Sequence, residues 1–241
     1  MPGYYGFYGF DWTYLVIVLP CLLLAALASA SVNSTFKRYS KQLSSRRITG
    51  AQAAQRVLHS HGVTNVRIER VGGNLTDHYD PKANVIRLSD SVYDNASTAA
   101  IGVACHEAGH AVQYAQHYAP IKLRAAIIPI TNFGSKLAMP LILLGIVLSA
   151  LGSYSYTLVY AGIACFSLSL VFQLITLPVE FNASRRALNA IEDGELLTRD
   201  ELKGARKTLT AAAMTYVAAV AVSAAQLLRL ILLFGNRRRN D

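Results

Sequence analysis

Long apolar runs dominate the pattern of this chain. Four of them cover residues 13–31, 127–151, 158–179 and 209–234. The first and third contain no charged residue, whereas Lys136 interrupts the second and Gln226 and Arg229 lie in the fourth. Roughly 20 apolar residues cross the hydrocarbon core as one helix, so the pattern predicts four transmembrane helices. A half-inserted last helix is the alternative.

Basic residues collect on one side of these runs. After the first run come Lys37, Arg38, Lys41, Arg46 and Arg47, and after the third come Arg185, Arg186, Arg199, Lys203, Arg206 and Lys207. The positive-inside rule therefore places these segments in the cytoplasm, with the uncharged loop 152–157 outside. Arg237, Arg238 and Arg239 would lie outside and do not fit this rule. No Lys or Arg precedes the first run, so we expect a retained anchor rather than a cleaved signal peptide.

Composition supports a membrane protein. Hydrophobic residues make up 53% of the chain and charged residues 15%, with a net charge of +9. Most basic residues flank apolar runs and accompany no nucleic-acid motif, so we expect a lipid partner and no nucleic acid. Cys21 and Cys165 lie in apolar runs, and Cys105 precedes His106 and so projects from a different side of its helix. This predicts no disulfide framework and no thiolate metal site.

The segment between the first two runs predicts a small α+β lobe. Residues 49–52 form a capping box that opens a helix to about His61, with Gly62 as its stop. Residues 66–71, 75–80 and 85–88 predict three strands of an antiparallel sheet. The expected fold is a mainly α membrane protein with about four transmembrane helices and a small cytoplasmic zincin-like lobe. The expected segments are an anchor (1–36), the lobe (37–124), a transmembrane hairpin (125–179), cytoplasmic helices (180–208) and a last span with a basic tail (209–241).

The motif H-E-x-x-H follows these strands, in a helix expected from near Ser97 to before Pro120. His106 and His110 are one turn apart on one face and can offer two nitrogens to one ion, with Glu107 beside them. Such a helix typically holds catalytic zinc, with the glutamate as general base. The motif therefore predicts one zinc ion and peptide-bond hydrolysis.

The third ligand must come from another His, Asp or Glu. Glu180 is the prominent candidate, because it follows the third apolar run at its cytoplasmic end. The alternative is a carboxylate in the first turn of a helix, where it complements the macrodipole. We also expect the strand 85–88 to hold an extended substrate by main-chain hydrogen bonds, or to be an ordinary strand.

The chain resembles the bacterial membrane-bound neutral zinc metallopeptidases of the YugP type, and more distantly gluzincin membrane proteases of the HtpX and CAAX-prenyl protease kind. The matching pieces are LTDHYDP (75–81), VIRLS (85–89), GVACHEAGHAVQ (102–113), YAPIKLR (118–124), LPVEFNASRRAL (177–188) and ELKGARKTLTAAAMTYVAA (201–219). They follow one another over nearly the whole chain.

The resemblance implies that His106, His110 and Glu180 are zinc ligands and that Glu107 is the catalytic acid and base. Gluzincins commonly have E-x-x-x-D, whose aspartate orients a zinc-bound histidine, but Ser184 occupies that position in this chain. A second group must fix the imidazole tautomer, so either Ser184, Asn182 or an acid such as Asp77 does so, or the site is weaker than usual.

His78 has three interpretations in the sequence. It could donate a hydrogen bond to the oxyanion, act as a fourth ligand that blocks water, or be a hydrogen-bonded turn residue.

We expect a multi-pass zinc metalloendopeptidase of the bacterial plasma membrane, with its active site at the cytoplasmic face. Its substrates would be membrane proteins or unfolded segments, and membrane partners or a homo-oligomer are compatible with the sequence. The alternative is a non-catalytic scaffold with a structural zinc site. An intramembrane site-2 protease is disfavoured, because the last two apolar runs supply no aspartate ligand.

Overall fold

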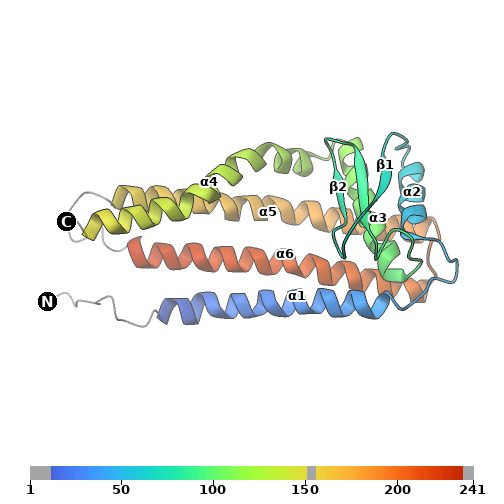
Figure 1. Cartoon of the computed structure of the whole chain (residues 1–241), viewed down its shortest axis with the longest axis horizontal. Coiled ribbons are helices and arrows are strands. Elements are labelled where there is room, and N and C mark those ends of the chain that lie inside the picture. Colours follow the sequence, from blue (N-terminus) through green and yellow to red (C-terminus); the bar gives the residue numbers. More distant parts are fainter. Residues whose placement is uncertain (1–11, 151–155, 236–241) are drawn as a thin grey trace. The chain divides into compact units, whose positions relative to one another are not determined.

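The computed structural model describes residues 12–150 and 156–235, and helices dominate it (Figure 1). The elements are the π-helical turn η1 (Tyr14–Val18), α1 (Leu19–Tyr39), α2 (Gly50–Ser60), β1 (Arg67–Val71), β2 (His78–Asp80), β3 (Val85–Ser89), α3 (Thr98–Ala115), α4 (Ala119–Ala150), α5 (Tyr156–Asp193) and α6 (Arg199–Phe234). Four helices are long and apolar enough to cross a membrane: η1 with α1, α4, α5 and α6. The predicted mainly α membrane protein with a small α+β lobe is confirmed.

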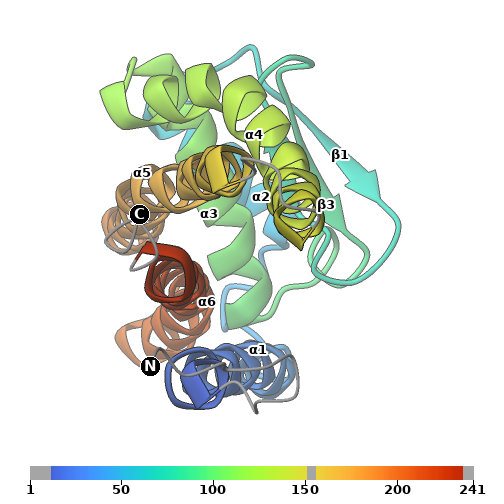
Figure 2. The ribbon, with the colours of Figure 1, turned by 90° about the vertical axis from the view of Figure 1, so that its left-hand side faces the viewer.

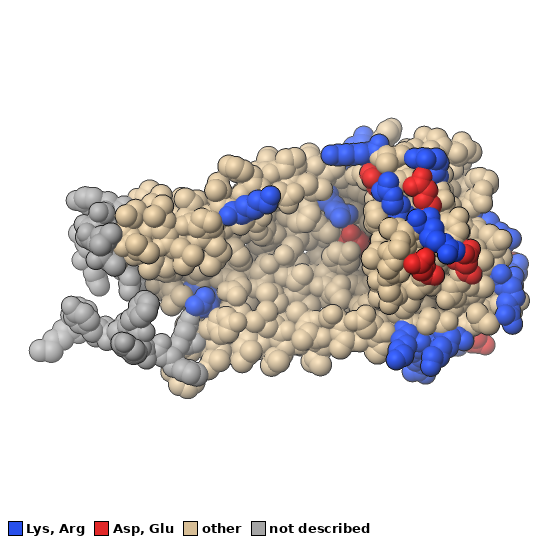
Figure 3. Space-filling view, viewed as in Figure 1, with Lys and Arg blue, Asp and Glu red and all other residues tan. Residues whose placement is uncertain are grey.

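The described chain divides into two compact units. The apolar unit comprises residues 12–27, 129–150, 156–172 and 218–235, and the site-bearing unit comprises residues 28–128 and 173–217. Figure 3 shows charged side chains gathered over the elements of the site-bearing unit, whereas the surface over the apolar unit is almost free of them. The five segments expected from the sequence remain a prediction.

In the apolar unit, α4 and α5 approach each other closely at Gly162. A Cβ built there would lie 2.8 Å from the carbonyl oxygen of Ala138 and 2.6 Å from the side chain of Ile142. Tyr160 donates its hydroxyl to the carbonyl of Phe234 at 3.0 Å. This hydrogen bond satisfies the Tyr160 hydroxyl in an apolar segment, where an unpaired polar group costs several kcal/mol.

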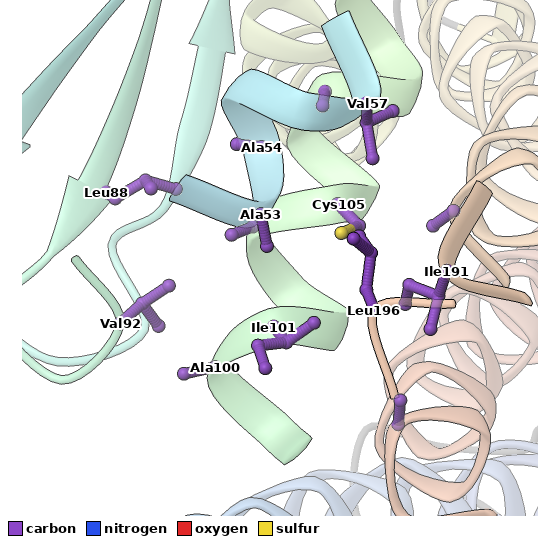
Figure 4. Packing of buried hydrophobic residues seen from close by; sticks show 14 of the residues in the cluster. Ala53, Ala54, Val57, Leu88, Val92, Ala100, Ile101, Cys105, Ile191 and Leu196 are labelled. Atoms are coloured by element: carbon purple, nitrogen blue, oxygen red, sulfur yellow. The ribbon is translucent and has the colours of Figure 1, made fainter. Parts of the chain in front are cut away.

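The core of the site-bearing unit surrounds α3 (Figure 4). Leu88 of β3 and Val57 of α2 belong to this core, and Leu196 and Ile191 lie near Cys105. Each fully buried aliphatic side chain of this kind contributes about 1.5–3 kcal/mol. The predicted helix α2 is confirmed, including the reciprocal capping-box hydrogen bonds of residues 49 and 52.

The sheet is mixed, and the expectation of an antiparallel sheet is wrong for one of its two pairings. The strand order is β1-β3-β2, with β2 antiparallel and β1 parallel to β3. Alternating apolar residues indicate which face of a strand is buried but not which strand lies beside it. Residues 85–88 form the central strand, so they have no free edge for a substrate, and that expectation is also wrong.

Helix α3 runs across the parts of α5 and α6 that belong to the site-bearing unit (Figure 2). Two glycines allow this. A Cβ built at Gly102 would lie 3.2 Å from the Cβ of Ala205 in α6, and one at Gly109 would lie 2.8 Å from the carbonyl oxygen of Ala183 in α5. The second approach is close enough to require glycine, and it brings α5 directly against the H-E-x-x-H turn.

Candidate metal centre and active site

The H-E-x-x-H residues lie in the buried part of α3. Ser97 caps the start of this helix by accepting a backbone N–H of the first turn, as expected for a helix that begins there. The imidazole rings of His106 and His110 lie 4.7 Å apart, centroid to centroid, at 84°. Glu107 and His110 are only 9% and 8% exposed. Buried groups of this polarity require hydrogen-bonding partners or a metal ion.

Glu180 reaches both histidines from α5. Its Oε2 is 3.3 Å from Nε2 of His106 and 3.5 Å from Nε2 of His110, and its side chain is 3% exposed. Helix α5 is continuous through Pro178, so Glu180 lies well inside the helix. The alternative that this carboxylate serves the first turn of a helix is therefore wrong.

The three side chains fit one zinc ion. His106, His110 and Glu180 each offer one ligand atom, and these atoms all lie within 4.8 Å of one another. Two imidazole nitrogens and one carboxylate oxygen form a donor set of catalytic zinc sites, which leave a fourth position to water. Within residues 12–150 and 156–235 the group has these three members. The ligand set implied by the resemblance is thus brought together by two helices.

Each histidine is held at its other ring nitrogen by an oxygen. The hydroxyl of Ser184 is 3.1 Å from Nδ1 of His106, and Oε1 of Gln113 is 3.0 Å from Nδ1 of His110. The amide of Gln113 donates to the carbonyl of Val179 and to Oδ1 of Asn182, each at 2.9 Å. Because Nε2 of Gln113 donates twice, its Oε1 accepts from Nδ1–H of His110. Nε2 of His110 then keeps its lone pair for a metal.

The three residues expected to orient a zinc-bound histidine make different contacts. Ser184 contacts His106 directly, whereas Asn182 contacts Gln113 and thus acts one bond further from the histidines. Asp77 accepts hydrogen bonds from the backbone N–H and the hydroxyl of Ser89, at distances of 2.8 to 3.1 Å. The Asp77 carboxylate therefore fixes the loop before β2.

His78 lies on the rim of the site, apart from the ligand group. Its Nδ1 is 2.9 Å from the carbonyl of Thr76, and its Nε2 is 3.5 Å from Nη1 of Arg87. A neutral imidazole that donates from Nδ1 has no proton at Nε2. His78 would have to carry both protons to donate to an oxyanion. It is hydrogen-bonded, but it is the first residue of β2, so the interpretation as a turn residue is wrong.

Sequence reasoning missed three residues at this site. Gln113 lies three residues after His110 on the same helix face, a spacing that could have indicated its role. Arg124 donates from Nη1 to Oε1 of Glu180 at 3.3 Å, and its buried Nε has no hydrogen-bond partner in the described chain. Tyr216 of α6 lines the site beside Glu180. No local signal pointed to Arg124 or Tyr216.

Two cavities flank the ligand group. One, of about 210 Å³, has apolar walls that include Val32, Val103 and Leu209. The other, of about 240 Å³, is more polar and includes Tyr114 and Arg124. Shared lining residues are Asp77, His106, Glu107, Glu180 and Tyr216. Glu107 therefore borders both cavities.

The electrostatics of the site follow from burial and from neighbouring carboxylates. Burial acts to lower the pKa of His110, but Glu180, Glu107 and the Gln113 hydrogen bond act against it, and the net result is a raised pKa. Burial also raises the pKa of Asp77, against the hydrogen bonds from Ser89. Burial raises the pKa of the Cys105 thiol. Cys105 is a fully buried residue of the core.

The fold and this cluster define a polytopic helical membrane protein in which an H-E-x-x-H helix and Glu180 could hold one metal ion. The chain belongs to the family described as "Putative neutral zinc metallopeptidase", whose model matches residues 14–235. A protein of Bacillus subtilis (strain 168) named "Putative membrane protease YugP" is 46% identical to it over 225 residues, which cover 93% of this chain and 98% of the relative. No solved structure matches the chain. The expected resemblance is confirmed, and the family implies zinc as the cofactor.

Proposed function

We propose that this chain is a zinc metalloendopeptidase that cleaves polypeptides at the cytoplasmic face of the membrane. The observation that carries the proposal is the buried group of His106, His110 and Glu180, with Glu107 next to it on the same helix. The oxygen partners of both Nδ1 atoms support it further, because they leave both Nε2 atoms directed at Glu180.

The residues of the chain divide the chemical work. When bound to the three ligands, a zinc ion supplies Lewis acidity that acidifies water and polarises a carbonyl. Glu107 takes a proton from the attacking water and delivers it to the amine nitrogen as the peptide bond breaks. Arg124 neutralises the second oxygen of Glu180, so the buried carboxylate is compensated.

Tyr216 supplies the hydrogen-bond donor for the developing oxyanion. Its side chain lines both cavities together with Glu107 and Glu180, and its phenol can donate a hydrogen bond. Tyr216 is 37% exposed, so it can meet a substrate. Loss of one such donor typically lowers kcat about 100- to 1000-fold. We expect Tyr216→Phe to keep zinc and to show this loss in kcat with little change in KM. An unchanged kcat would remove Tyr216 from the mechanism.

The substrate backbone pairs with β2 rather than with β3. Strand β2 is an edge of the sheet, because among the described residues its one partner strand is β3. His78 and Tyr79 of β2 line the same cavity as Glu107 and His110. An extended peptide added at a strand edge is held by main-chain hydrogen bonds, which places its carbonyl groups in reach of the site without demanding a particular side chain.

Charge supports the cytoplasmic orientation. Lys37, Arg38 and Lys41 lie in the site-bearing unit directly after the apolar part of α1, which is the pattern of a cytoplasmic flank. Glu180 follows the apolar run of α5 by one residue, so the site lies near the headgroups. Membrane proteins and unfolded segments at the interface are therefore the substrates we propose.

Replacement of Glu107 by Gln tests the proposal. Purified protein would be measured for zinc per chain and for hydrolysis of dye-labelled casein, an unfolded polypeptide. We expect Glu107→Gln to retain zinc and to lose at least about 100-fold in hydrolysis, the lower range for general acid–base catalysis. Glu192→Gln, which alters an exposed glutamate of α5, should match the unmodified chain. If the unmodified chain and both variants bind zinc and none of them hydrolyses casein, the scaffold alternative is favoured instead.

A further inference from the structure

A groove lies between α5 and α6 in the site-bearing unit, next to the apolar cavity of the metal site. It has a volume of about 430 Å³. Its α5 side includes Phe181, Arg185 and Asn189, and its α6 side includes Arg206, Thr210 and Met214. In each helix these three residues are four positions apart, so they form a row along one helix face.

Two arginines give this groove a positive charge. Arg185 and Arg206 are exposed, and neither has an ion pair within the described residues. Other basic residues nearby are engaged: Arg186 donates to Asn182 and Gln116, and Lys203 pairs with Asp200. No acidic residue lines the groove. Its chemistry is therefore complementary to an anion.

Along their helices, Arg206 lies within the headgroup level of a bilayer and Arg185 lies just beyond it. Arg185 lies six residues after the apolar run of α5, and Arg206 lies three residues before that of α6. At 1.5 Å per residue these offsets are about 9 Å and about 4.5 Å. The headgroup region on each side of the hydrocarbon core is roughly 5–7 Å thick. Both guanidinium groups, on long side chains, can thus reach the lipid phosphates.

The other end of each row is apolar. Phe181 and Met214 are 43% and 48% exposed, and each lies on the side of its arginine that leads into the apolar run. A cationic mouth followed by an exposed apolar face suits a molecule that has an anionic head and hydrocarbon chains. A soluble anion would use only the first of these features.

We propose that this groove is a binding site for an anionic phospholipid. Arg185 and Arg206 hold the phosphate, Asn189 and Thr210 offer hydrogen bonds to the headgroup, and an acyl chain lies along Phe181 and Met214. The neighbouring wall is shared with the active site, because Ser184, Leu209 and Ala213 line both the groove and the apolar cavity. A bound lipid therefore contacts the residue that holds His106.

Native mass spectrometry of the detergent-purified chain tests this site without any need for hydrolysis. The probes are phosphatidylglycerol and phosphatidylcholine with the same acyl chains. The groove variant is Arg185→Gln with Arg206→Gln. The control is Arg199→Gln with Lys207→Gln, which removes the same charge from exposed residues outside the groove.

We expect the unmodified chain and the control to prefer phosphatidylglycerol, and the groove variant to bind it about 30-fold more weakly at low salt, given the usual contribution of a basic residue at an anionic membrane. Equal losses in both variants would show general attraction to a basic surface and would overturn the proposal. So would soluble glycerol phosphate that binds as tightly as the lipid. A melting temperature equal to that of the control verifies that the groove variant is folded.

Discussion

Replacement of Gly109 by Ala tests how the fold brings the third ligand to the histidines. The new Cβ would lie 2.8 Å from the carbonyl oxygen of Ala183, whereas ordinary contact begins at 3.4 Å, so α3 and α5 must separate by about 0.6 Å. The obstacle is backbone and cannot rotate away. Zinc–ligand distances in a well-formed site agree with their usual values to within about 0.2 Å. Because Glu180 and Ser184 are on the displaced helix, we expect at least a 10-fold loss of zinc affinity.

Gly102→Ala is the matched control on the same helix. Its Cβ would meet the Cβ of Ala205 at 3.2 Å, which requires a shift of only a few tenths of an ångström. Both substitutions gain about 1 kcal/mol of helix propensity, whereas overpacking costs about 1–3 kcal/mol. We therefore expect Gly102→Ala to be near neutral and Gly109→Ala to be destabilised by up to about 2 kcal/mol.

The assay combines zinc per chain, measured at buffered zinc concentrations, with the melting temperature in detergent. The two variants should differ in both quantities, and the zinc defect should persist at temperatures where Gly109→Ala is folded. The reasoning is refuted if Gly109→Ala binds zinc as tightly as Gly102→Ala does. The close approach of α3 and α5 would then not be what positions the carboxylate.

Three further substitutions address the surroundings of the ligands. Gln113→Ala should weaken zinc binding about 10- to 100-fold, because the imidazole it orients becomes free to rotate; the exposed Gln55→Ala should have no effect in the same titration. Ser184→Asp should bind zinc more tightly than Ser184→Ala in competition with a chelator, since a carboxylate at Nδ1 of His106 restores the gluzincin pattern, and equal affinities would contradict this role. Folding raises the pKa of Asp77 above 3.8, so the folded chain holds this proton more tightly and its stability falls as pH rises through the raised pKa. Asp77→Asn should remove that slope from melting temperatures between about pH 4 and pH 7, and an unchanged slope would assign it to other groups.

The spacing in the sequence predicts two of the three ligands, whereas the resemblance implies the third. His106 and His110 follow from the spacing in one helix, which any α-helix would realise. Glu180 remained one of two interpretations until the resemblance implied its role, because 70 residues separate it from His110. The folded chain brings it within 3.5 Å of both Nε2 atoms.

Local signals therefore determined the elements of this protein. The signals are the four apolar runs, the capping box at residues 49–52 and the H-E-x-x-H helix. The capping box and the motif depend on residues within one or two turns of each other, each run is continuous in the sequence, and the structure contains each of these elements. Only the tertiary structure decided that β1 pairs in parallel with β3, that Gln113 holds His110, and that Arg124 and Tyr216 border the site. The physical reason is that partners in a sheet or across two helices are selected by packing of the whole unit, and no short-range pattern encodes that choice.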